Sequence, residues 1–153
     1  IEWAKEHFRY IWDAPQVGGG LPKIDMVEVA ERFIAAELFQ IQPIPVKHGV
    51  LDVYGYRTGN FAYLSDVSAI PSSSRDLLAD LDILVIDAVR RKPHDTHFHV
   101  DAAVETAKEL GANQTYLTHL SHLLRHEDLA ADLPDGIDPA YDGLTFTIDA
   151  DAA

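Results

Sequence analysis

The sequence LDILVIDAV, at positions 81–89, is the most informative stretch of this chain. Its centre, residues 83–86, is an uninterrupted run of aliphatic residues, which is typical of a strand buried on both faces of a sheet. A helix is predicted next, at residues 100–110, because small and apolar residues recur there on one face and Gly111 is suited to end it. A buried strand followed by an amphipathic helix predicts an α/β layered domain.

The rest of the chain extends this pattern in both directions. A short helix is predicted within residues 1–12, and the break at Gly18, Gly19, Gly20 and Pro22 makes residues 1–22 an irregular leading segment. Two further helices are expected, at residues 72–80 and 120–131. Residues 27–38 also fit a helix, so the first strand below has an alternative. Strands are expected at residues 27–33, 39–44 (ending near His48), 50–56, 60–64, 115–118 and 144–148, with a hairpin turn at 57–60.

Length and composition favour one folded domain, residues 1–153. Hydrophobic residues make up 47% of the chain and charged residues 24%, as in ordinary globular proteins. No apolar run approaches the roughly 18 residues that cross a bilayer. Residues 1–10 do not resemble a signal peptide, which predicts a cytoplasmic location and no membrane partner. The chain has no cysteine, so any metal must be held by imidazole and carboxylate groups.

The charge of the chain limits its substrates. The formal net charge is −13, from 25 acidic and 12 basic residues. Binding to long nucleic acid depends on Lys and Arg neutralising phosphates, so a long DNA or RNA substrate is disfavoured. A small phosphate ester, drawn to bound cations, is compatible with this surface.

Potential metal ligands follow four of the predicted strands. Histidine and aspartate side chains at strand ends suit a site for zinc or a similar divalent ion, because α/β folds gather functional loops at one sheet edge. Singly, each has an ordinary reading as a loop residue, a buried histidine or a helix cap. Together they favour a metal site. The residues are His48, Asp66, the group His94, His97 and His99, and the pair His119 and His122.

Several short motifs indicate a family. They are PVKHG at 45–49, GYR at 55–57, AYLSD at 62–66, HDTHF at 94–98, YLTHLSH at 116–122, LP at 133–134 and YDGL at 141–144. This set resembles the later motifs of the metallo-β-lactamase superfamily, and within it the branch that contains phosphoribosyl cyclic phosphate phosphodiesterase. The resemblance covers residues 43–148. It implies the C-terminal part of an αββα metallo-β-lactamase sandwich that hydrolyses small phosphodiesters, cyclic or nucleotide-like, with two divalent ions, zinc or manganese.

The resemblance also implies residue roles. His48 would hold the first metal, Asp66 would bridge both metals, and His119 would hold the second. His97 would protonate the leaving oxygen beside the scissile phosphate, and His122 would contact the phosphate or a metal ligand. His94 and His99 receive no role.

One departure from the family is large. Its His-x-His-x-Asp-His run, which supplies two ligands to each metal, is absent, and the chain begins at Ile1. These facts predict a missing N-terminal half and little or no turnover by these 153 residues alone. The alternatives are a half-fold that has lost its site, or one completed by a partner chain. A non-catalytic half-domain would instead bind a partner, or form a homodimer, through an exposed apolar sheet face. Hydrolysis of β-lactams or thioesters stays open, while a tRNA-processing nuclease is disfavoured by the lack of basic clusters.

Overall fold

The computed structural model describes residues 1–153 except 14–19, 21, 30–31, 36–38 and 149–153. The chain divides into two compact units, Ile1–Ala30 and Glu31–Ala153, which are described separately. The first unit contains helix α1 (Glu2–His7) and the 3-10 helix η1 (Arg9–Ile11). This confirms the short helix expected within residues 1–12. Most of the glycine break lies outside the described residues.

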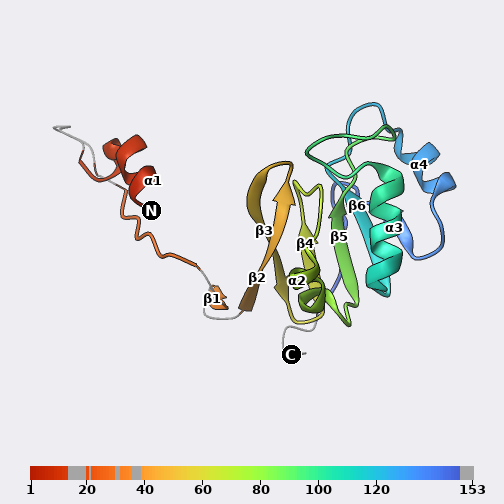
Figure 1. Ribbon diagram of the computed structural model, residues 1–153, viewed down its shortest axis with the longest axis horizontal. Helices are drawn as coiled ribbons and strands as arrows, with labels where there is room; N and C mark the ends of the chain where they lie inside the picture. The colour runs from red at the N-terminus through yellow and green to blue at the C-terminus, as the bar shows by residue number, and fades with distance from the viewer. Residues whose placement is uncertain (14–19, 21, 30–31, 36–38, 149–153) are drawn as a thin grey trace. The chain divides into compact units, whose positions relative to one another are not determined.

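The second unit is built on one sheet. Within the described residues its seven strands lie in chain order (Figure 1). The pairings from β1 to β4 are antiparallel and those from β4 to β7 are parallel. The strands are β1 (Phe33–Ala35), β2 (Phe39–His48), β3 (Leu51–Thr58), β4 (Phe61–Leu64), β5 (Ile83–Asp87), β6 (Gln114–Thr118) and β7 (Ile137–Pro139).

Most predicted strands are confirmed. The apolar run at 83–86 forms the buried strand β5, and the strands expected at 39–44, 50–56, 60–64 and 115–118 are β2, β3, β4 and β6. The strand expected at 27–33 is wrong for residues 27–29, which have no regular structure, because pairing with β2 begins only at Phe33. The helix alternative for 27–38 also fails at 27–29 and at β1.

Three helical segments accompany the parallel strands. They are α2 (Ser72–Arg75) with the 3-10 helix η2 (Asp76–Leu78), α3 (Val100–Leu110) and α4 (His126–Asp132). Helix α3 has the predicted bounds, and Gly111 ends it with a left-handed φ of 70°. The helix expected at 120–131 begins only at His126. Residues 120–125 form a turn instead, in which the Ser121 N–H donates to the Val89 carbonyl at 3.0 Å. No helix in the described part of the chain is long and apolar enough to span a membrane.

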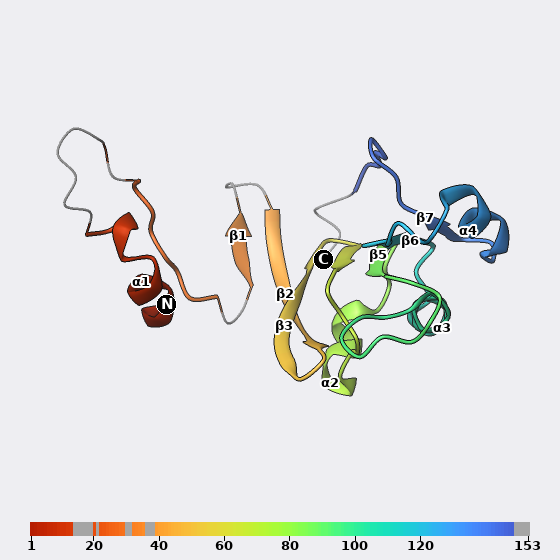
Figure 2. The ribbon, with the colours of Figure 1, turned by 90° about the horizontal axis from the view of Figure 1, so that it is seen from above.

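The two faces of the sheet differ in chemistry. Helices α2 and α3 lie on one face (Figure 2), where Leu64, Leu84 and Leu117 form the centre of the core. Successive side chains along a strand point to opposite faces of the sheet, and on the other face many of them are aromatic. Tyr56 stands opposite Tyr63 in the register, and both remain more than 40% exposed.

The predicted strand at 144–148 is wrong. Strand β7 occupies the sheet edge beside β6, and residues 144–148 run over the aromatic face instead. The ring of Phe146 stacks on Tyr116, with a centroid distance of 5.8 Å, and tilts against Phe61 at 5.4 Å. Aromatic contacts, and not backbone pairing, hold this segment.

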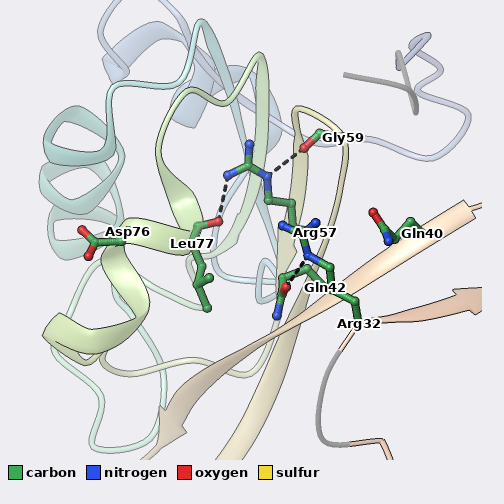
Figure 3. A pocket seen from close by; sticks show the side chains of 7 residues that line it. All are labelled: Arg32, Gln40, Gln42, Arg57, Gly59, Asp76 and Leu77. Atoms are coloured by element: carbon green, nitrogen blue, oxygen red, sulfur yellow. Dashed lines mark hydrogen bonds between the residues drawn. The ribbon is translucent and has the colours of Figure 1, made fainter. Parts of the chain in front are cut away.

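Arg57 ties the β3–β4 hairpin to the segment that follows α2. Its guanidinium donates to the carbonyl oxygens of Gly59 (2.7 Å), Leu77 (2.9 Å) and Ala79 (2.8 Å), two of which Figure 3 shows. Burial lowers the pKa of Arg57, and the negative charge of Asp80 opposes this shift. The hairpin is therefore anchored at the end of the sheet opposite the carboxyl end of β4.

Replacing Gly55 with alanine is expected to destabilise this unit by about 1–3 kcal/mol. A Cβ at Gly55 would overlap Leu64 Cδ2 and lie 3.1 Å from the Tyr63 carbonyl oxygen. The midpoint of urea unfolding measures the effect. Gly20→Ala is the control, since nothing lies within 4 Å of a Cβ at that position. An unchanged midpoint for Gly55→Ala would contradict the packing described here.

Candidate metal centre

Three of the predicted ligands meet at one end of the sheet, where strands β2, β4 and β6 finish, because these strands run in the same direction. His48 is the last residue of β2, Asp66 lies two residues beyond β4, and His119 directly follows β6. Strands β4 and β6 each pair with β5 in parallel, so all three run in the same direction. Strand β2 also runs in this direction, because both of its links to β4, the pairings β2–β3 and β3–β4, are antiparallel. Their carboxyl ends therefore lie at the same end of the sheet.

Backbone strain marks two of these positions. Asp66 and His119 adopt left-handed φ angles of 57° and 58°. Such angles are uncommon outside glycine and tend to cluster at functional sites. At this edge they turn two polar side chains toward each other, so that Asp66 Oδ1 and His119 Nε2 lie 3.8 Å apart.

The donor set fits a divalent cation. His48, Asp66 and His97 each offer a ligand atom, and these atoms lie within 4.8 Å of one another. Asp87, His97 and His119 form a second such group. Imidazole nitrogens with one exposed carboxylate are ligands that zinc and manganese accept. His97 belongs to both groups, so geometry alone allows it to act either as a ligand or as a proton donor.

The tautomer of His48 suits metal binding. Its Nδ1 lies 2.8 Å from the Thr96 carbonyl oxygen. A carbonyl only accepts hydrogen bonds, so Nδ1 carries the proton and Nε2 keeps a free lone pair. Gly49 makes this approach possible, because a Cβ there would lie 2.9 Å from Thr96 Cγ2 and its φ is +60°. The β2–β3 turn thus orients a predicted ligand.

His97 is held by a buried carboxylate. Its Nδ1 lies 2.7 Å from Asp87 Oδ2, which also accepts the Val67 N–H at 3.0 Å. Asp87 is fully buried and His97 is 12% exposed. Burial raises the pKa of Asp87, although the hydrogen bonds from His97 and Val67 oppose the shift. This hydrogen bond fixes the orientation of the ring and engages Nδ1, which leaves Nε2 as the ring nitrogen for the site's chemistry.

Sequence reasoning missed Asp87. It is the seventh residue of the run quoted first, LDILVIDAV, and the last residue of β5, where it reads as the polar end of a buried strand. The available signal was its place at a strand end, shared with His48, Asp66 and His119. Its Oδ1 is buried and has no hydrogen-bond partner among the described residues, which is unusual for a carboxylate.

The other candidate histidines separate into two groups. The ring of His94 lies 5.0 Å from that of His97, and its Nδ1 accepts the Thr96 N–H at 3.3 Å, so a neutral ring carries its proton on Nε2. His122 is exposed, and no interaction found within the described residues involves its ring. His99 precedes α3, and its carbonyl accepts the Ala103 N–H. His94 therefore lies next to the cluster, while the two groups of close ligand atoms in the described residues include neither His122 nor His99.

The fold and this cluster define a class of protein: a metallo-β-lactamase-fold hydrolase. The family model described as the β-lactamase superfamily domain matches residues 2–120, and the chain belongs to that family. The match includes the leading segment, upstream of the region of residues 43–148 that carried the resemblance. It makes divalent metals the general expectation for this site, without fixing their identity.

Three relatives are similar to this chain over most of its length. A solved structure described as a new diphosphatase from the PhnP family is 42% identical, with a TM-score of 0.81 over 94% of this chain and 52% of that one. An octanoyltransferase of Porphyromonas gingivalis is 33% identical over 97% of this chain, but only 31% of the relative. Human tRNase Z, short form, is 18% identical with a TM-score of 0.59, over 77% of this chain and 45% of that one, and shows the fold alone. The chain spans about half the length of these solved relatives and under a third of the octanoyltransferase.

Proposed function

We propose that this chain carries part of a two-metal phosphodiesterase site for small substrates, such as cyclic phosphates or nucleotide-like diesters. The observation that carries the proposal is the cluster of His48, Asp66, His97 and His119, whose ligand atoms meet at one sheet edge. The relative described as a diphosphatase of the PhnP family supports hydrolysis of a phosphate-containing substrate. The net charge of −13 further supports a small substrate over a long polyanion.

Each residue has a role in this proposal. His48 would hold one ion through Nε2, Asp66 would be shared by both ions, and His119 would hold the other. Bound divalent cations supply the charge that activates water and offsets negative charge on the phosphoryl oxygens. These three residues fill only part of two coordination shells, so further ligands must come from water, another segment or a partner chain.

The proton transfer is assigned to the His97–Asp87 pair. Asp87 accepts the Nδ1–H of His97, which leaves Nε2 to protonate the departing alkoxide. A histidine that acts as a general acid must first be protonated, and the Asp87 carboxylate stabilises the positive charge of the His97 ring in that state. His94 offers a second donor beside it, since its Nε2–H is free to approach a phosphoryl oxygen. A contact between His122 and the phosphate stays a prediction.

A second function has its own supporting observation. Tyr54, Tyr56 and Tyr63 on the aromatic face are 49%, 45% and 41% exposed. Such a face fits a non-catalytic domain that pairs with another chain or forms a homodimer.

One experiment separates the two functions. Three properties are measured on one sample of purified protein with added zinc or manganese. They are the metal content by elemental analysis, the oligomeric state by sedimentation, and the rate of hydrolysis of bis(p-nitrophenyl) phosphate. The proposed function expects close to two equivalents of metal and metal-dependent hydrolysis once the ligand set is complete. A dimer that binds no metal, even at saturating concentration, would favour the pairing function and reject the metal site.

A further inference from the structure

A pocket opens beside the candidate metal centre. It has a volume of about 310 Å³ and is lined by Thr118, His119, Leu120, Ala140, Tyr141 and Asp142. One wall is the end of β6 and the other is the segment that follows β7. His119 also faces Asp66, at 3.8 Å, and His97, at a ring-centroid distance of 4.9 Å. A substrate whose phosphate lies at the metal centre can therefore reach this pocket with its neighbouring group.

A defined turn fixes the second wall. The Ala140 N–H donates to the Leu117 carbonyl at 2.8 Å, which joins the wall to β6. The Leu144 N–H then donates to the Tyr141 carbonyl at 3.1 Å, closing a four-residue turn. Gly143 occupies its third position with a φ of +91°, as a type II turn requires. Tyr141 and Asp142 are thus the first two residues of an ordered turn.

His126 positions the ring of Tyr141. The two rings meet edge to face, with centroids 6.0 Å apart and planes at 84°. The Nε2–H of His126 donates to the Pro139 carbonyl at 3.3 Å, which ties the histidine to β7. The aromatic wall of the pocket therefore has a support of its own.

The chemistry of this wall selects a kind of ligand. Within the described residues, no hydrogen bond or ion pair engages the Asp142 carboxylate. An ionised carboxylate accepts hydrogen bonds and repels anions, and a tyrosine adds an apolar ring face and a hydroxyl. A neutral group with hydroxyl hydrogens satisfies both, whereas a second phosphate meets a like charge.

We propose that this pocket binds the hydroxyl-bearing, uncharged part of the substrate, with Asp142 accepting from its hydroxyls and Tyr141 packing on its carbon face. Tyr141 and Asp142 are then specificity-determining residues, and a second phosphate that enters this pocket meets the negative charge of Asp142. The inference rests on the proposed function, because it requires a phosphate group held at His48, Asp66 and His119.

Binding of small probes to the zinc-saturated protein with a complete ligand set tests the inference without requiring turnover. The probes are glycerol 3-phosphate, ethyl phosphate and pyrophosphate, and two-dimensional NMR titrations give each Kd. The wild-type protein is expected to bind glycerol 3-phosphate about fivefold to tenfold more tightly than ethyl phosphate, in line with hydrogen bonds to a charged group. Asp142→Asn should reduce this ratio to about twofold and strengthen pyrophosphate binding about fivefold.

Matched variants separate specific from general effects. Asp135→Asn removes the same charge at another turn, and Tyr54→Ala removes an exposed tyrosine from the aromatic face; both should keep the wild-type ratio. Tyr141→Ala should lower the ratio without favouring pyrophosphate. Equal binding of the first two probes in the wild-type protein, or no change in Asp142→Asn, overturns the inference while the proposed function stands. If none of the phosphate probes binds, the proposed function fails and the inference falls with it.

Discussion

Replacing His97 with glutamine is expected to slow hydrolysis of a diester with an alkyl leaving group by about 10²–10⁴-fold, the usual contribution of a general acid. An alkoxide leaves poorly unless it is protonated, and glutamine cannot supply that proton. Hydrolysis of the corresponding p-nitrophenyl diester should fall by less than about tenfold, because nitrophenolate leaves without one. Steady-state kinetics with the two substrates measures the difference in metal-loaded protein with a complete ligand set.

The metal content distinguishes this role from coordination. His97 lies within both candidate ligand groups, so elemental analysis of His97→Gln must accompany the kinetics. Unchanged metal content with a strong leaving-group dependence identifies a proton donor. A loss of metal, with equal losses for both substrates, would show that His97 is a ligand and that the assigned role is wrong. Asp87→Asn should also slow hydrolysis of the alkyl diester more than that of the p-nitrophenyl diester, because Asp87 holds the His97 ring.

Replacing Asp66 with asparagine is expected to weaken metal binding by at least about 100-fold, since even residues behind the ligands contribute about 10–100-fold. Asparagine keeps the shape of the side chain and tolerates the left-handed backbone, with a φ of 57°, so the fold should be retained. The change removes the negative charge and one oxygen ligand. Isothermal titration with zinc or manganese measures the affinity.

A surface aspartate supplies the control for this charge change. Asp52 pairs with Lys47, is 85% exposed and belongs to neither candidate ligand group, so Asp52→Asn should leave metal affinity close to that of the wild-type protein. Equal affinities for Asp66→Asn and the wild-type protein would remove Asp66 from the metal centre. The unfolding midpoint of each variant confirms that the comparison involves folded protein.

The sequence was sufficient to predict most of the residues that the structure brings together in the candidate site, because strand ends are local signals. The runs before His48, Asp66 and His119 are apolar and end in polar residues, and parallel strands bring such ends together. The same reasoning places His94 and His97 in one loop. It cannot say which of them faces the site. That depends on contacts such as His48 with Thr96, 48 residues apart.

The misses have physical causes as well. Asp87 escaped notice because a buried aspartate at the end of an apolar run is ambiguous until its partner His97 is placed. Residues 120–125 have helical composition, but the bond from Ser121 to Val89 fixes a turn there. Residues 144–148 have strand composition, yet Phe146 packs on Tyr116 and Phe61 and the segment joins no strand ladder.

The left-handed backbones at Asp66 and His119 have a consequence for divergence within the family. At both positions two separate demands coincide, one from the cation and one from the peptide conformation. A descendant that has abandoned metal binding is released from the first demand alone. Such a sequence should drift toward glycine or asparagine at 66 and 119, and only rarely toward valine, isoleucine or threonine. Glycine at these positions in a relative therefore indicates that metal binding has been lost while the backbone conformation has been retained.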